Sequence, residues 1–151
     1  MNITYRQFKN SDKKIVAELM KSLAAEDSEC KPSSNLKIDK TFTELSNHPD
    51  KGTIIVLEDG VKIVGYSILI NFWSNEYGGN ILEIDELYIK SDYRKRGIGT
   101  NFIQYLIANK FSNCVAVELE TMPSNNRASQ LYKRIGFKSS QNNHFIYNFR
   151  R

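Results

Sequence analysis

A short basic stretch with two glycines, SDYRKRGIGTNF at residues 91–102, is the part of the sequence best suited to hold an anion. It places three consecutive cations directly before Gly97 and Gly99, and an apolar helical pattern follows at once. Backbone N–H groups at the start of a helix lack intrahelical partners and carry the positive end of the helix dipole. The stretch predicts a phosphate or diphosphate site, although its spacing matches neither the Walker loop nor the dinucleotide-binding fingerprint. A solvated basic turn is the alternative that the motif alone leaves open.

Three carboxylates lie on the predicted strand just before this stretch, at Glu83, Asp85 and Glu86. A carboxylate can attract an ammonium ion and accept its proton, which an amine must lose before it can act as a nucleophile. We expect Asp85 and Glu86 to serve first, because they are nearest to an irregularity in the strand. The alternative is that at least one of the three is an ordinary solvent-facing carboxylate.

The irregularity is a change of phase in the apolar residues of that strand. Leu82 and Ile84 share one phase, whereas Leu87 and Ile89 have the opposite one. One extra residue between the two pairs would produce this change, because side chains of a strand alternate strictly between its faces. The pattern predicts a β-bulge beside the carboxylates.

Hydrophobic periodicity predicts the elements that position these residues. In chain order we expect strand 2–8, helices 11–26 and 36–47, two strands within 52–73 joined by a tight Asp59-Gly60 turn, strand 80–90, helix 98–111, strand 114–121, helix 124–137 and strand 144–149. This order predicts an α+β domain with a mixed, mostly antiparallel central sheet flanked by helices and one β-α-β crossover. The anion site then lies where strand 80–90 meets the following helix.

The composition suits a single domain spanning residues 1–151, since 40% of the residues are hydrophobic. No apolar run is long enough for a membrane helix and the first residues lack a secretory pattern, so we expect a cytoplasmic protein. The positions of Cys30 and Cys114, and those of His48 and His144, do not match the spacing of metal ligands, so we expect no bound metal. The net charge of +4 comes from 21 basic and 17 acidic residues that are interspersed. A nucleic-acid-binding domain is therefore disfavoured.

Two motifs resemble those of the GNAT superfamily, the acyl-CoA-dependent N-acyltransferases. Arg94 to Gly99, RKRGIG, is similar to the family's Arg/Gln-x-x-Gly-x-Gly/Ala loop. A second family element is similar to three parts of this sequence: Asn126 with Ala128, the Leu-Tyr pair that ends at Tyr132, and the Gly-Phe pair that ends at Phe137. The resemblance covers about Val61 to Phe137 and implies a GNAT-like fold in which the β-α-β crossover forms the coenzyme A site.

The resemblance also implies roles for individual residues. The loop amides would hold the cofactor's diphosphate, with cations nearby, and its pantetheine arm would pair with the strand after the bulge. The residues expected to bind the cofactor are Leu87, Tyr88, Ile89, Arg94, Lys95, Arg96, Gly97, Ile98, Gly99, Thr100, Asn126 and Tyr132. Tyr132 would in addition serve as general acid to the leaving thiolate, whereas its helical apolar stripe alone suggests a core aromatic.

The acceptor is expected between the first two helices and at the long hairpin. Carboxylates and aromatics there suit a cationic amine through ionic and cation–π contacts. The residues expected to bind it are Glu26, Glu29, Trp73, Glu76 and Tyr77. Local similarity to diamine acetyltransferases over residues 82–100 favours a small cationic amine.

The residues and the resemblance together predict an enzyme, an acetyl-CoA-dependent N-acetyltransferase that acts on a primary amine. Members of the family are often dimers, so the resemblance also implies a homodimer as an expectation. A non-catalytic acyl-CoA sensor and an acetyltransferase of protein amines are the alternatives.

Overall fold

The computed structural model describes residues 1–27 and 34–149, so the expectations for Glu29 and Cys30 lie outside the described residues. The described chain consists of two compact units, Met1–Glu120 and Thr121–Arg151. No helix in the described part of the chain is both long and apolar enough to cross a membrane.

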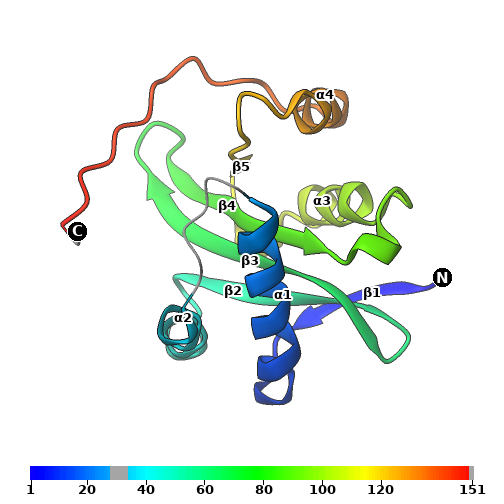
Figure 1. The fold of residues 1–151 in the computed structure, drawn as a ribbon. Coiled ribbons are helices and arrows are strands. Elements are labelled where there is room, and N and C mark those ends of the chain that lie inside the picture. The colour runs from blue at the N-terminus through cyan, green and yellow to red at the C-terminus, as the bar shows by residue number, and fades with distance from the viewer. Residues whose placement is uncertain (28–33, 150–151) are drawn as a thin grey trace. The chain divides into compact units, whose positions relative to one another are not determined.

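A five-stranded mixed sheet forms the first unit, in the order β1-β2-β3-β4-β5 (Figure 1). The first four strands are antiparallel to their neighbours, whereas β4 and β5 are parallel. The strands are β1 (Ile3–Gln7), β2 (Gly52–Asp59), β3 (Lys62–Ser74), β4 (Gly79–Ile89) and β5 (Ala116–Leu119). The predicted α+β class with a mostly antiparallel sheet is confirmed.

The described residues of this unit form the α-helices α1 (Lys13–Glu26), α2 (Asn35–Asn47) and α3 (Ile98–Ala108). Short 3₁₀ helices span Asn10–Asp12, Ser91–Tyr93 and Phe111–Asn113. The apolar stripes of α1 and α2 share one core with β2, β3 and β4, around Phe42 and Tyr66. The stripe of α3 is buried as well, and the ring of its Phe102 lies 5.1 Å from that of Tyr5 on β1. Helices and sheet thus hold the ends of β3 and β4 in place.

The turn between β2 and β3 differs in detail from the expected one. Asp59 pairs with Lys62, so the two central residues are Gly60 and Val61 rather than Asp59 and Gly60. Gly60 has a φ of 63°, whereas Val61 is absent from the residues with positive φ. One glycine at the first central position is enough for a tight hairpin, since that turn type needs a positive φ only there.

The second unit contains the predicted helix as α4 (Asn126–Ile135). The Asn125 side chain accepts a hydrogen bond from Ala128 N, and Gly136 ends the helix with a φ of 114°. The expected strand 144–149 is wrong: the described residues of this unit form no strand, so the segment has no partner strand within its unit. Its apolar side chains are exposed, 88% for Phe145 and 92% for Phe149.

Candidate active site

A β-bulge in β4 is confirmed at the position that the apolar phase change predicts. Ile68 of β3 pairs with Glu86, but the next residue, Leu69, pairs with Ile84, so Asp85 is the extra residue. The bulge turns Glu86 and the residues after it into a new phase. Two of the three expected carboxylates therefore lie at the point where the strand is irregular.

Glu86 is fixed at both its side chain and its backbone. Tyr66, a fully buried residue of β3, donates a hydrogen bond to Glu86 Oε2 at 2.6 Å. Ser67 is also fully buried, and its hydroxyl donates to the Glu86 carbonyl at 2.8 Å. Sequence reasoning missed both residues, because only the β3–β4 register, which pairs Tyr66 with Tyr88 and Ser67 with Leu87, brings them near Glu86.

Burial raises the pKa of the Glu86 carboxyl, the Tyr66 hydrogen bond lowers it, and the charge of Asp85 raises it, with a net rise. Burial also raises the pKa of Asp85, and the charge of Glu120 adds to this rise. A carboxylate with a raised pKa is a better proton acceptor near neutral pH than an ordinary one. Burial raises the pKa of Tyr66 too, so its hydroxyl keeps the proton that it donates.

Beyond the bulge, β4 has β3 as a neighbour on one side only. The pairing of β5 with β4 runs from Ile81 to Ile84 and stops there. Among the described strands, none pairs with the other edge of β4 from Asp85 to Ile89. This edge carries the backbone of Leu87, Tyr88 and Ile89, so the predicted backbone pairing of an extended ligand has a free edge available.

The glycine stretch forms the start of α3, as predicted. Gly97 is the residue before the helix, with a φ of 77°, and no side chain caps the helix N-terminus. Among the described residues, no side chain accepts from the first backbone N–H groups of the helix, those of Ile98, Gly99 and Thr100. A β-carbon at Gly99 would have Leu87 Cδ2 as its nearest neighbour outside the helix, at 3.8 Å. The start of α3 thus faces the strand that follows the bulge, and Gly99 leaves room there.

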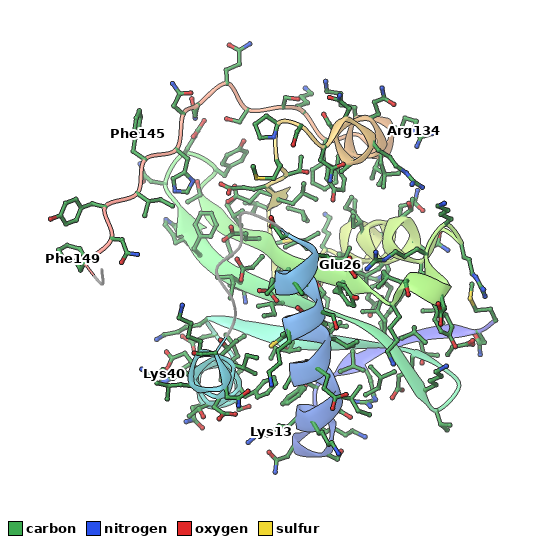
Figure 2. The ribbon with its side chains drawn as sticks, in the orientation of Figure 1. Lys13, Glu26, Lys40, Arg134, Phe145 and Phe149 are labelled. Carbon is green, nitrogen blue, oxygen red and sulfur yellow. The ribbon has the colours of Figure 1, made fainter. Side chains whose placement is uncertain are left out.

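The cations of the stretch have different surroundings. Arg94 turns away from the helix start: its Nη2 donates to both carboxylate oxygens of Glu26, at 3.0 and 2.7 Å, and its Nε donates to the Ile89 carbonyl at 2.7 Å. The same Glu26 accepts a hydrogen bond from the Tyr88 hydroxyl at 2.8 Å, and the Arg94 guanidinium lies 5.1 Å from the centre of the Tyr88 ring. Figure 2 shows Glu26 at the end of α1.

Arg96 and Lys62 both approach the ring of Tyr93. The Arg96 guanidinium lies 5.5 Å from the ring centre and the Lys62 ammonium 5.3 Å from it. Sequence reasoning did not include Lys62, which comes from the first residue of β3 and meets the loop only in the folded chain. Two cations therefore converge on the 3₁₀ turn just before α3, which leaves a positive site for an anion even with Arg94 engaged.

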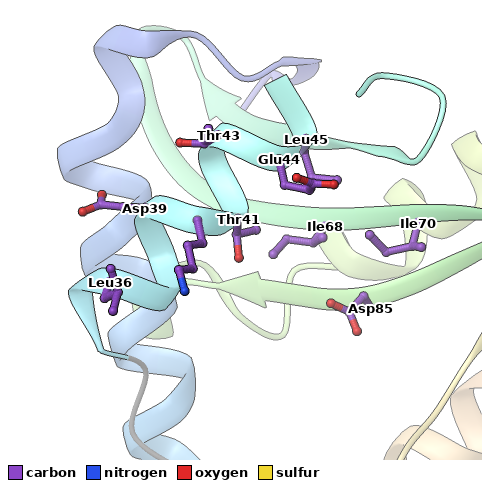
Figure 3. Close-up of a pocket in the computed structure, with 10 residues that line it drawn as sticks. Leu36, Asp39, Thr41, Thr43, Glu44, Leu45, Ile68, Ile70 and Asp85 are labelled. Atoms are coloured by element: carbon purple, nitrogen blue, oxygen red, sulfur yellow. The ribbon is translucent and has the colours of Figure 1, made fainter. Parts of the chain in front are cut away.

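A pocket of about 620 Å³ lies between α2 and the bulged strands (Figure 3). Its lining residues are Leu36, Asp39, Lys40, Thr41, Thr43, Glu44, Leu45, Ile68, Ile70 and Asp85. Asp85 thus belongs both to the bulge and to the pocket. The pocket is not lined by the expected acceptor residues Glu26, Trp73, Glu76 and Tyr77.

Those expected acceptor residues lie elsewhere in the first unit. Glu26 binds Arg94 and Tyr88, while Trp73 and Tyr77, at the end of the long hairpin, are 67% and 61% exposed.

Glu83 pairs with Ile70 and Glu118 in the sheet, one residue before the bulge region. Asn126 and Tyr132 belong to the second unit, where the rings of Tyr132 and Phe137 lie 6.0 Å apart. The roles given to all these residues stay predictions.

Comparison with known proteins identifies one family over most of the chain. The model of the acetyltransferase (GNAT) family matches residues 16–137. Two curated relatives are similar to part of the chain. The thialysine N-epsilon-acetyltransferase of Bos taurus is 32% identical over 78 residues, and an uncharacterised N-acetyltransferase of Methanocaldococcus jannaschii is 35% identical over 95 residues. These matches cover 51% and 61% of this chain but only 45% and 42% of the relatives, so the chain spans less than half of their length.

Solved structures share the whole fold. A possible acetyltransferase from Clostridium difficile 630 matches over 100% of both chains with a TM-score of 0.85 and 25% sequence identity. A GNAT family acetyltransferase from Staphylococcus aureus matches over 98% of this chain with a TM-score of 0.71 at 24% identity, which shows likeness of fold alone.

Proposed function

We propose, on the premise that this chain belongs to the acetyltransferase (GNAT) family, that it transfers an acetyl group from acetyl-CoA to the nitrogen of a small primary amine. The observation that carries the proposal is the bulge: two adjacent carboxyls with raised pKa values lie where β4 loses its second neighbour, and the strand after them faces an uncapped helix start. The name of the bovine relative, a thialysine N-epsilon-acetyltransferase, supports an amine acceptor.

The residues of the first unit fit a coenzyme A donor. The uncapped N–H groups from Ile98 to Thr100 would bind the diphosphate, and the absence of a β-carbon at Gly99 leaves space for its close approach. Arg96 and Lys62 add positive charge beside it. The open edge of β4 after Asp85 would pair with the amide groups of the pantetheine arm. When bound, acetyl-CoA supplies the acetyl group as a thioester.

Proton removal falls to the bulge carboxylates in this proposal. An alkylammonium ion has a pKa of about 10, so an amine arrives at neutral pH without a free electron pair. Asp85 or Glu86, directly or through a water molecule, accepts one proton. The nitrogen then forms a bond to the acetyl carbon while the carbon–sulfur bond breaks. The thiolate takes up one proton, for which we propose Tyr132 as the donor. The nitrogen loses its second proton as the amide forms, and this proton restores the Tyr132 hydroxyl, so the net result is one proton released to the carboxylate base.

The direct test measures thiol release from acetyl-CoA with a panel of primary amines. We expect Asp85→Asn and Glu86→Gln to lower kcat/KM by about 100-fold or more, as loss of a general base does. Glu18→Gln, at an exposed position of α1, serves as the matched control and should keep full activity. Tyr132→Phe should reduce turnover with coenzyme A affinity retained in calorimetry. Full turnover of the Asp85 and Glu86 variants would refute the proposed base.

A further inference from the structure

A fully buried serine lies beside the bulge, in the middle of an apolar strand. Ser67 of β3 has no exposed surface, and its neighbours Tyr66 and Ile68 are buried as well. A hydroxyl in such a place lowers stability unless it makes a hydrogen bond, a cost that an alanine would avoid. The Ser67 hydroxyl makes its bond across the strand pair, to the Glu86 carbonyl oxygen at 2.8 Å. The serine thus serves one backbone group of the bulge.

That contact shows the direction of the peptide group between Glu86 and Leu87. A trans peptide group is planar, so its C=O and N–H bonds point in opposite directions. The described chain has no cis peptide bond. The Glu86 carbonyl points toward β3, where Ser67 donates to it. The Leu87 N–H therefore points away from β3, toward the edge of β4 with which no described strand pairs.

The backbone at the end of β4 gives the same direction independently. The Lys90 N–H donates to the Val64 carbonyl of β3 at 2.9 Å. The N–H groups of residues two apart on a strand point the same way, and those of adjacent residues point to opposite sides. The Tyr88 N–H therefore points toward β3, whereas the Leu87 N–H points to the open edge.

The bulge explains why this peptide group needs a side chain to hold it. An extra residue disrupts the regular ladder, so the peptide groups next to it are less constrained than those within a continuous ladder. Asp85 is that extra residue, and the Glu86–Leu87 peptide follows it directly. Leu87 also lies beside the start of α3, where its Cδ2 is 3.8 Å from the position of a β-carbon on Gly99. Its N–H thus faces the region in which the proposed function places the thioester.

We propose that Ser67 is a positioning residue of the acetyl transfer: it holds the Glu86 carbonyl so that the Leu87 N–H donates a hydrogen bond to the thioester carbonyl. This inference rests on the proposed acetyltransferase function. A donor held in place before the reaction stabilises the negative charge that develops on that oxygen in the transition state. Ser67 does not touch the substrate and supports an interaction that strengthens in the transition state, so its loss lowers kcat more than it raises KM.

The infrared band of a bound thioester reports this hydrogen bond without any turnover. Acetyl-CoA with ¹³C in the thioester carbonyl is bound to the protein in the absence of an amine. A hydrogen bond lowers the frequency of a C=O stretch, so we expect the band of Ser67→Ala at a higher frequency than that of the wild type. Calorimetry should show an unchanged affinity for coenzyme A. In the thiol-release assay, Ser67→Ala should lower kcat by about 10-fold, less than the roughly 100-fold or more that removal of an oxyanion donor costs.

Two further variants separate this role from a general loss of stability. Val64→Ala, at another fully buried position of β3, should change neither the band nor kcat. Ser67→Cys offers a weaker donor of similar size and should give an intermediate band and an intermediate kcat. It carries the test by itself if Ser67→Ala does not fold.

The possible failures point to different errors. A band unchanged by the Ser67 variants, or a loss of kcat in Val64→Ala as large as theirs, would overturn the inference while amine acetylation stands. A wild-type protein that binds no acetyl-CoA, or that releases no thiol with any amine, would overturn the proposed function and the inference together.

Discussion

Removal of the ion pair between Glu26 and Arg94 should show whether Arg94 acts through Glu26 or directly on the cofactor. The pair joins the last residue of α1 to the first residue of the RKRGIG loop, and the Tyr88 hydroxyl shares the same carboxylate. If this contact fixes the loop, Glu26→Gln and Arg94→Met should damage stability and coenzyme A binding in the same way. Their effects should then overlap in the double variant.

The structure limits the size of that overlap. The guanidinium makes two hydrogen bonds to the carboxylate, but the side chains are 38% and 46% exposed. Solvent screening at this exposure reduces an ion pair to at most about 1 kcal/mol, well below the roughly 4 kcal/mol of two charges at an effective dielectric constant of 20. We expect a coupling free energy of about 0.5–1 kcal/mol, the range of an exposed ion pair, because one nitrogen, Arg94 Nη2, makes both hydrogen bonds to the carboxylate.

Urea unfolding of the wild type, the two single variants and the double variant gives the coupling directly. Glu18→Gln combined with Arg94→Met is the control pair and should be additive, because Glu18 lies two turns earlier on α1. Isothermal titration of coenzyme A with the same proteins completes the test. Additivity of Glu26→Gln and Arg94→Met within about 0.3 kcal/mol would refute the coupling. A loss of coenzyme A affinity confined to Arg94→Met would show that Arg94 contacts the cofactor itself.

Three further predictions concern the bulge, the loop and the core. The acidic limb of the pH profile of kcat/KM reports the pKa of the carboxyl that must be deprotonated. Asp85→Asn should move this limb to lower pH, because a like charge that raises the pKa of Glu86 is lost, and Tyr66→Phe should move it to higher pH, because a hydrogen bond that lowers this pKa is lost. Rates measured in a stopped assay from acid to neutral pH test both shifts, and a limb that does not move in either variant would contradict both assignments. Gly97→Ala should lower the free energy of unfolding, measured in urea, by about 1–2 kcal/mol and weaken coenzyme A binding, because the φ of 77° is strained for a residue with a β-carbon. A variant as stable as the wild type would contradict this strain and mean that the loop relaxes. Phe102→Ala should lower the free energy of unfolding by about 3–5 kcal/mol, since the Phe102 side chain of α3 is fully buried. A loss below about 1 kcal/mol in the same assay would contradict that packing.

Features that depend on neighbouring residues could be predicted from the sequence. The phase change of the apolar residues placed a bulge between Ile84 and Leu87, since strand side chains alternate with a fixed period, and the β3–β4 register then made Asp85 the extra residue. Gly97 at the start of α3 and Gly136 at the end of α4 both have the positive φ that glycine adopts without strain. The strand expected at 144–149 was wrong, because β-propensity describes what a strand can bury and cannot supply a partner strand.

Contacts between distant residues were decided only by the tertiary structure. Glu26 and Arg94 are 68 positions apart, and Tyr66 meets Glu86 because β3 and β4 pair in one particular register. The pocket is formed by α2 against β3 and β4, so its charged residues Asp39 and Lys40 carried no signal of a site in the sequence. The sequence by itself determined which segments form the loop, the bulge and the helix start, because these follow from local backbone geometry. The partners of Arg94 and Glu86, and the pocket beside the bulge, depended on how the elements pack. Side chains that meet in the folded chain are brought together by register and burial rather than by their spacing along the chain.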